Sequence, residues 1–256
     1  MPKQPPASSH PPAVSAGDHD PATLLARLRS ALAAAGDPER AEGARAYMKS
    51  AMPYHGVAAT PQRAIFRDVF SRFNHGSPKE WRDAVLYLWR NAEYREERYA
   101  ALWLSGDLDA VDFHTTAVLP MYEEMIVTGA WWDYVDEIAT HRLPAVLLRD
   151  RAEMAEAMRA WSRDENLWKR RASILCQNPL KQRTDLDLLQ ACLEPSLGSR
   201  EFFLRKAIGW ALRQYARTDA AWVERYVRDH AAELSPLTKR EALKAQMKSG
   251  VIREIP

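Results

Sequence analysis

Three stretches of the chain decide its fold: WWDYVDEIA at residues 131–139, LWKRRASIL at 167–175 and KAIGWALRQYA at 206–216. In each stretch, apolar residues recur at intervals of three and four, which is the pattern of a helix with one buried face. Trp132, Arg171 and Trp210 follow one another at a constant spacing of 39 residues. The spacing predicts a repeated helical unit in which these three residues lie at equivalent places and line one face.

The rest of the 256-residue chain also favours an all-α fold. Glycine contributes only 10 residues, and 6 of the 16 prolines lie within the first 21 positions. Beyond them the chain is rich in strong helix formers such as Ala, Leu, Arg and Glu. Helical stretches alternate with short breakers, which lie at 53–61, 74–78, 105–106, 128–129, 178–179, 195–199 and 235–236. A period near 40 residues is typical of stacked HEAT or armadillo helix pairs.

The first 20 residues differ in composition from the rest. They are rich in Pro, Ser and Ala, so we expect a disordered tail over residues 1–20 and one domain over 21–256. No window approaches the ~18 consecutive apolar residues of a membrane span, and the N-terminus lacks the apolar core of a secretory signal. Cys176 and Cys192 form no CxxC pair, which fits a reducing cytoplasm. We expect a cytoplasmic protein with no membrane partner.

The charge of the chain is unevenly distributed. The formal net charge is only +2, but residues 161–217 contain 11 Lys or Arg against 6 Asp or Glu, a local net charge of +5. A local basic excess on a near-neutral protein is typical of a surface that faces a polyanion. The alternative is an ordinary solvated surface.

The helix expected at 131–140 places an aromatic residue beside a carboxylate. Its core side carries Trp131, Tyr134, Val135 and Ile138. Trp132 and Asp136, four residues apart, lie at the border of this face. They are either a peripheral core residue and a surface carboxylate, or an aromatic wall beside a carboxylate that could stabilise a developing cation.

The helix around Trp210 separates its apolar and basic residues. Its apolar face consists of Ile208, Ala211, Leu212 and Tyr215. Trp210 lies on the other side, in line with Lys206, Arg213 and Arg217. Two interpretations remain open: an indole stacked on arginine at the surface, or a nucleic-acid surface with cations for phosphate and an aromatic ring for sugar or base.

The middle helix carries three consecutive cations. Trp168, Ala172, Leu175 and Cys176 face its core, while Lys169, Arg170 and Arg171 lie beside or beyond that face. The cations form either a solvated turn or a set of phosphate anchors.

No metal is expected, because the seven histidines form no HxH, HExxH or His/Cys ligand pattern. P-loop, Rossmann and GxSxG motifs do not occur either, and His55-Gly56 is interpreted as structural.

The chain resembles the AlkD family of bacterial alkylpurine DNA glycosylases, which are built from HEAT-like repeats. The resemblance runs from about Leu25 to Lys244. It rests on YMKSAMPYHGV and TPQR near the start, TGAWWDYVDEIA, NLWKRRASILCQ, EFFLRKAIGWALRQYA and LSPLTKREALK. WWDxVDxIA, W-x-x-RxxxIL and KAIGWxLRxY in this order are a specific combination.

The resemblance implies a fold, a reaction and a set of site residues. The fold would be an α-α superhelix with a concave basic face for DNA. The reaction would be the hydrolytic release of cationic N3- and N7-alkylated purines from duplex DNA in base excision repair, without base flipping. Because no lysine adjoins the carboxylate in the motif, we expect a monofunctional enzyme without lyase activity, and we expect no cofactor. Asp136 would be the catalytic carboxylate, Trp132 and Trp210 would contact the deoxyribose, and Arg171 would hold the DNA backbone.

Further contacts with DNA are expected from the basic segment, at Arg170, Lys206, Arg213 and Arg217. We expect a monomer that acts at the nucleoid. The competing hypothesis is a non-catalytic helical-repeat scaffold that binds DNA or protein through the same face. Only the enzyme requires Asp136.

Overall fold

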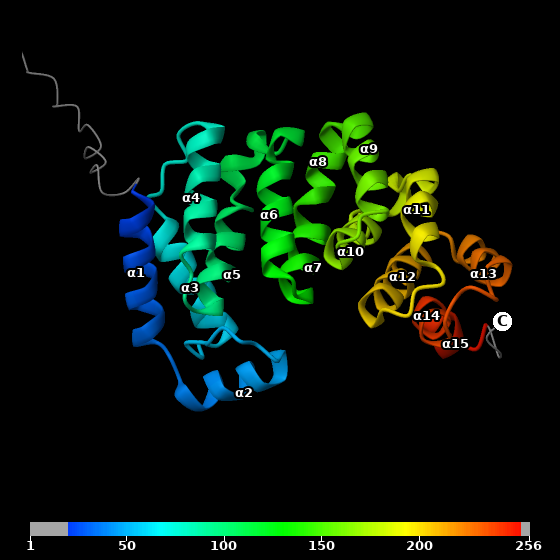
Figure 1. Cartoon of the computed structure of the whole chain (residues 1–256), viewed down its shortest axis with the longest axis horizontal. Helices are drawn as coiled ribbons and strands as arrows, with labels where there is room; N and C mark the ends of the chain where they lie inside the picture. Colours follow the sequence, from blue (N-terminus) through cyan, green and yellow to red (C-terminus); the bar gives the residue numbers. More distant parts are fainter. Residues whose placement is uncertain (1–19, 252–256) are drawn as a thin grey trace, which may run out of the picture. The chain divides into compact units, whose positions relative to one another are not determined.

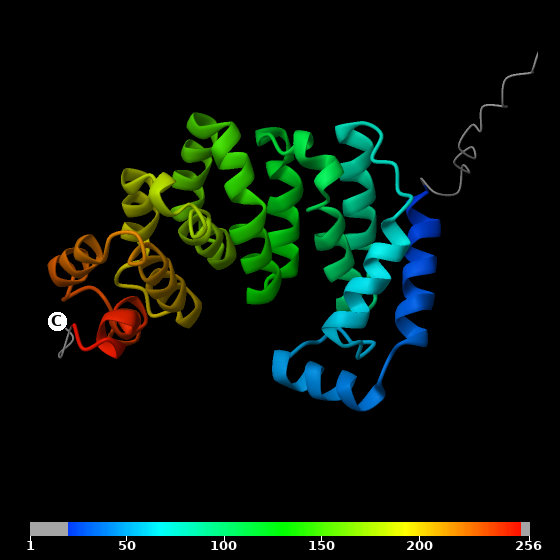
Figure 2. The ribbon, with the colours of Figure 1, turned by 180° about the vertical axis from the view of Figure 1, so that it is seen from behind.

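The computed structural model describes residues 20–251, and within that range the protein is all-α (Figures 1 and 2). Fifteen α-helices and four 3-10 helices account for its regular structure, with no strand among these residues. The predicted fold class is therefore confirmed. The tail expected over residues 1–20 lies outside the described residues, except for Asp20.

The described chain forms two compact units, the first of which ends at Ala101. The helices that begin in the first unit are α1 (Pro21–Ala34), α2 (Pro38–Met48), α3 (Ala59–Phe70), α4 (Pro78–Arg90) and α5 (Arg95–Leu104). The prediction of a single domain over residues 21–256 stays a prediction.

The second unit begins at Leu102 and contains the three stretches that carry the 39-residue spacing. Its α-helices are α6 (Leu119–Gly129), α7 (Trp132–His141), α8 (Leu143–Arg149), α9 (Arg151–Ser162), α10 (Leu167–Leu175), α11 (Leu186–Leu193), α12 (Phe202–Tyr215), α13 (Ala220–Asp229), α14 (Pro236–Ala242) and α15 (Lys244–Lys248). Its 3-10 helices are η2 (Leu108–Phe113), η3 (Thr116–Val118), η4 (Lys181–Arg183) and η5 (Glu194–Ser196).

Short polar side chains and prolines set where many helices begin. Side chains that accept hydrogen bonds from first-turn N–H groups belong to Asp20, Asp37, Ser77, Asn166, Asp185, Asp219 and Ser235. Proline is the first residue of α1, α2, α4 and α14, where its missing N–H has no helical partner to lose. One predicted breaker is shorter than expected: Pro61 lies in the first turn of α3, a place that tolerates proline.

In the first unit, α1 packs against α3 and α4, while α2 lies apart at one end (Figure 1). The loop that precedes α3 is held by a buried carboxylate. Glu96 accepts backbone hydrogen bonds from His55 at 3.0 Å, Gly56 at 2.8 Å and Val57 at 3.3 Å. Gly56 has φ +82°, and an added Cβ would lie 2.0 Å from the Asp37 carbonyl oxygen, so only glycine fits. These contacts support the structural interpretation of His55-Gly56.

In the second unit, α10 packs against both α7 and α12 (Figures 1 and 2). Trp132 lies on α7, Arg171 on α10 and Trp210 on α12, so the constant spacing places one residue on each of three helices packed in succession. The α12 helix also packs along α14. No helix among residues 20–251 is long and apolar enough to cross a membrane.

Candidate active site

The α7 helix has the faces that the sequence predicts, with one difference. Tyr134, Val135 and Ile138 are fully buried, and both Trp132 and Asp136 are half-buried at the border. Trp131, expected in the core, is also half-buried. It precedes the first turn of α7, and its ring lies 6.1 Å from the Trp168 ring and 5.5 Å from the Phe203 ring. Trp131 therefore packs against aromatic rings of α10 and α12 at the beginning of α7.

Asp136 and Arg171 form a two-pronged ion pair. Arg171 Nε donates to Asp136 Oδ1 and Nη2 donates to Oδ2, both at 2.7 Å. The remaining terminal nitrogen, Nη1, donates to the backbone carbonyl of Phe203 at 2.6 Å. Parallel charge-assisted bonds of this kind fix the plane of a carboxylate as well as its position. One guanidinium thus joins the catalytic candidate on α7 to the backbone of α12.

The site around this ion pair is poorly solvated. The Asp136 side chain is 16% exposed and the Arg171 side chain is 6% exposed. Burial raises the pKa of the Asp136 carboxyl above its ordinary value, because the charged form loses water; the bonds from Arg171 oppose this shift. A carboxylate in such surroundings acts on a nearby positive charge more strongly than it would in water.

The structure gives each of the three consecutive cations of α10 a partner within the protein. Lys169 Nζ lies 2.6 Å from carboxylate oxygens of both Glu123 and Asp164. Arg170 donates to the Pro195 carbonyl at 3.0 Å and to Ser196 Oγ at 2.9 Å. These three residues therefore do not form a simple solvated turn. Their predicted phosphate contacts would have to compete with these bonds or use the remaining N–H groups.

The α12 helix also confirms its predicted apolar face. Ile208, Ala211 and Leu212 are buried, whereas Tyr215 is half-buried. Trp210 is half-buried on the other side, and Arg217, just beyond the helix, is exposed. Lys206 and Arg213 do not extend freely into solvent: both form ion pairs with Glu241 of α14.

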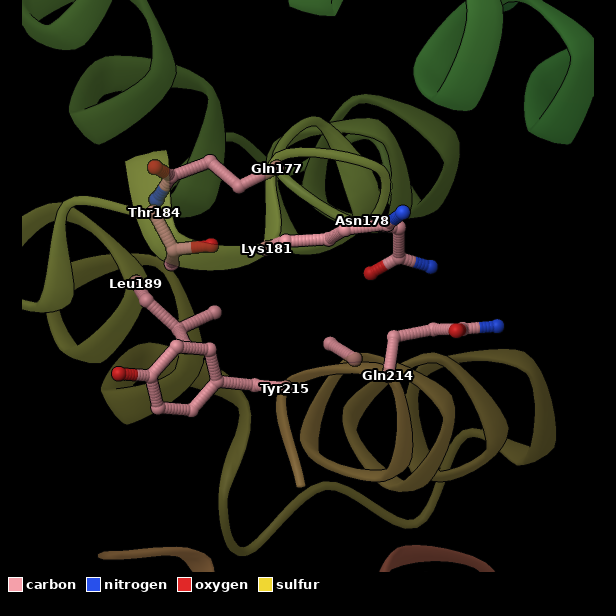
Figure 3. Close-up of a pocket in the computed structure, with 8 residues that line it drawn as sticks. Gln177, Asn178, Lys181, Thr184, Leu189, Gln214 and Tyr215 are labelled. Carbon is pink, nitrogen blue, oxygen red and sulfur yellow. The ribbon is translucent and has the colours of Figure 1, made fainter. Parts of the chain in front are cut away.

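A groove of about 800 Å³ lies beside Trp210. Its walls come from the end of α7, the segment between α10 and α11, and the second half of α12 with the residues after it. They comprise Thr140, His141, Asn178, Pro179, Lys181, Gln182, Trp210, Gln214, Arg217 and Thr218. Figure 3 shows a smaller neighbouring pocket, which shares Asn178, Lys181 and Gln214 with the groove. Trp210 and Arg217 are therefore brought together on a polar and partly cationic surface.

Asp136 lies on α7, the helix whose last residues form part of the groove wall. It does not line the groove itself, but Thr140, one turn later, does, and Thr140 Oγ1 donates to the Asp136 carbonyl at 2.7 Å. Among residues 20–251 no group of three His, Cys, Asp or Glu side chains is placed to hold a metal ion.

Comparison with known proteins identifies the family of this chain. The family model described as DNA alkylation repair enzyme matches residues 28–245. The chain belongs to this family. Among solved structures, the repair enzyme is similar to a predicted DNA alkylation repair enzyme from Enterococcus faecalis, with a TM-score of 0.73 and 28% identity over 82% of this chain and 95% of that one. None of the curated proteins compared with it matches. Family membership assigns the chain to the repair of alkylated DNA.

Sequence reasoning missed several groove residues of the repair enzyme. Thr140 and Gln214 could have been found, since each lies four residues after a predicted site residue and so shares its helical face. Lys181 gave no such signal. It lies between α10 and α11 with φ +53°, a left-handed conformation that is uncommon for a residue other than glycine. Outside the groove, Glu241 of α14 was missed because its partners, Lys206 and Arg213, lie on another helix.

Proposed function

We propose that the repair enzyme is a monofunctional DNA glycosylase that releases cationic N3- and N7-alkylated purines from duplex DNA by hydrolysing the N-glycosidic bond. The observation that carries this proposal is the oriented Asp136–Arg171 pair on α7 and α10, with Trp132 one turn from Asp136. The reaction would begin base excision repair, with a monomeric enzyme acting at the nucleoid in the cytoplasm.

The chemistry of the substrate explains why one carboxylate is enough. Alkylation at N3 or N7 makes the purine cationic, so the base is a good leaving group without a general acid. As the bond breaks, positive charge develops on the deoxyribose, and a carboxylate stabilises this oxocarbenium-like sugar. Asp136 would supply this negative charge and orient the attacking water.

The neighbouring groups have separate roles in this proposal. Trp132 and Trp210 would pack against the deoxyribose, and their π faces favour a cation. Arg171 would fix the plane of the Asp136 carboxylate, because two of its nitrogens bond to it. Arg171 would contact the DNA backbone through the N–H groups that are bonded neither to Asp136 nor to the Phe203 carbonyl. With the sugar gripped in this way, the lesion would stay stacked in the duplex.

Lyase chemistry would need a neutral amine near the sugar, and the α7 helix contains no lysine. Lys169 on α10 is held by two carboxylates. Desolvation acts to lower the pKa of Lys169, but the bonds that its ammonium donates to Asp164 and Glu123 outweigh this effect and raise the pKa. An ammonium group held in this way is not a nucleophile, which supports a monofunctional enzyme.

The decisive experiment is base release from duplex DNA that contains a single N7-methylguanine, with N3-methyladenine DNA as the second substrate. We expect free methylated base and an intact abasic strand that breaks only after alkali treatment. Strand cleavage without alkali would contradict the monofunctional assignment. DNA binding with no base release from either duplex would favour the scaffold hypothesis.

A further inference from the structure

A single carboxylate on α14 binds the two cations that bracket Trp210 on α12. Glu241 Oε1 accepts from Lys206 Nζ at 2.8 Å, and Oε2 accepts from Arg213 Nη1. Lys206 lies one turn before Trp210 and Arg213 one turn after it, so the three side chains share one side of the helix. Glu241 therefore contacts α12 at the level of Trp210.

The backbones of α12 and α14 come into close contact at the same level. A Cβ added to Gly209 would lie 2.5 Å from Glu241 Cβ and 3.0 Å from the Thr238 carbonyl oxygen. The Thr238 hydroxyl, itself buried, donates to the Arg205 carbonyl at 3.2 Å. Because Gly209, next to Trp210, has no side chain, α12 and α14 can come into close contact here. The contact leaves neither helix room to slide along the other.

We propose that Glu241 is a positioning residue that sets the place of the Trp210 ring in the groove. The inference rests on the proposed function, in which Trp210 contacts the sugar of the lesion. The Arg171 bond to the Phe203 carbonyl holds α12 near its beginning, and Glu241 holds it further along. Between these two attachments the helix has a fixed position, and Trp210 projects from it into the groove.

The charge of Glu241 separates this role from a DNA-binding role. A carboxylate beside Lys206 and Arg213 reduces their attraction for phosphate, so removing its charge should leave DNA affinity unchanged or higher. If the carboxylate positions Trp210, the same change should slow base release. A variant that was merely unfolded in part would lose both properties together.

The test compares Glu241→Gln with Glu233→Gln, which removes an equal charge from an exposed residue before α14. In single-turnover assays on N7-methylguanine duplex, Glu241→Gln should release base at least ~10-fold more slowly, since small misplacements of a contact group have effects of this size. The Kd for undamaged duplex should stay equal or fall. Glu233→Gln should resemble the wild type in both measurements.

A second measurement does not depend on activity. In ¹H–¹⁵N spectra of the indole groups, Trp210→Phe identifies the Trp210 signal. We expect that signal to shift or broaden in Glu241→Gln and in Lys206→Met, but not in Glu233→Gln, while the Trp89 signal of the first unit stays in place. Lys206→Met breaks one arm of the contact without burying a charge, so it decides the matter even if Glu241→Gln fails to fold.

The outcomes separate the two proposals. An unmoved Trp210 signal in a folded Glu241→Gln or Lys206→Met protein would overturn the positioning role, as would wild-type release by Glu241→Gln. If the wild-type protein releases no base, the glycosylase proposal fails, and the indole spectra still decide whether Glu241 places Trp210.

Discussion

Each unit of the protein contains a carboxylate paired with an arginine, and the two carboxylates have different surroundings. In the first unit, Glu97 has no exposed side-chain surface. It accepts from Arg29 at 2.8 and 3.0 Å and from the Glu93 backbone N–H at 2.7 Å, and His55 Nε2 lies 3.3 Å away. In the second unit, Asp136 is held by one arginine and keeps part of its surface exposed.

The two surroundings shift the carboxyl pKa values in opposite directions. Desolvation acts to raise the pKa of Glu97, but the bonds from His55, Arg29 and the Glu93 N–H outweigh it and lower the pKa to about 2. For Asp136 burial prevails, and the pKa rises. A carboxylate with this many partners stabilises the fold, whereas one with a single partner and some exposed surface can still act on a substrate.

The largest effect should come from Asp136→Asn. The amide keeps the shape of the side chain and removes the charge that would oppose the oxocarbenium ion, so base release should fall by about 10³-fold. Affinity for duplex DNA should remain largely intact. Single-turnover release from N7-methylguanine DNA measures the first quantity and fluorescence anisotropy the second. Activity within a few-fold of the wild type would remove Asp136 from the mechanism.

Glu97→Gln should show the opposite behaviour. Glu97 is fully buried and is bonded to Arg29, His55 and the Glu93 N–H. An amide in its place weakens these charge-assisted bonds, so the free energy of unfolding should fall by about 3 kcal/mol. Base release per folded molecule should be unchanged. Urea denaturation followed by circular dichroism measures the loss, and equal stability of the two proteins would show that Glu97 contributes no net stability.

The lowered pKa of Glu97 also predicts a pH dependence. A carboxyl whose pKa is lower in the folded state stabilises the fold above its unfolded value of 4.5 and loses this contribution as pH falls toward about 2. Wild-type stability should therefore decline over that window, and Glu97→Gln should flatten the decline. A parallel decline in both proteins would contradict this assignment.

Trp210 and Leu212 provide a smaller contrast within one helix. Because Trp210 is half-buried, Trp210→Ala should cost less than the ~3–5 kcal/mol typical of a buried tryptophan, and it should still reduce base release markedly. Leu212→Ala, at a fully buried position, should cost about 2–5 kcal/mol with little effect on release per folded molecule. Early melting of Trp210→Ala with normal release would make Trp210 a core residue.

The smallest effect concerns two arginines with different surroundings. Arg217 is exposed on the groove, so Arg217→Ala should reduce the slope of log K against log salt by about 1, the contribution of one phosphate contact. Arg29 is paired with Glu97, so Arg29→Ala should lower stability and leave the slope unchanged. Binding titrations between low and moderate salt distinguish the two variants. An unchanged slope for Arg217→Ala would place DNA elsewhere.

Helical periodicity made the fold and the faces of α7 and α12 predictable from the sequence. The buried positions of Ile138 and Leu212 and the border position of Asp136 follow from the 100° step between residues. Periodicity says which side of a helix a residue occupies, but not what it meets there. The partners of Arg171 and Arg213 lie 35 and 28 residues away on other helices, so their ion pairs depend on helix packing.

Pairing Asp136 with Arg171 also determines how far the field of the carboxylate reaches. A lone negative charge beside a DNA-binding groove repels phosphate over a distance of about 8 Å at physiological salt. A neutral pair behaves as a dipole, whose field decays more steeply than that of a charge. The net +5 of residues 161–217 includes Arg171, so the neutral pair leaves 5 − 1 = +4, to which an approaching polyanion responds, and it responds little to Asp136. Only a cation that forms within contact range interacts strongly with the carboxylate. Asp136 therefore has little electrostatic effect on the association with a polyanion, but a strong effect on a cation in direct contact with it.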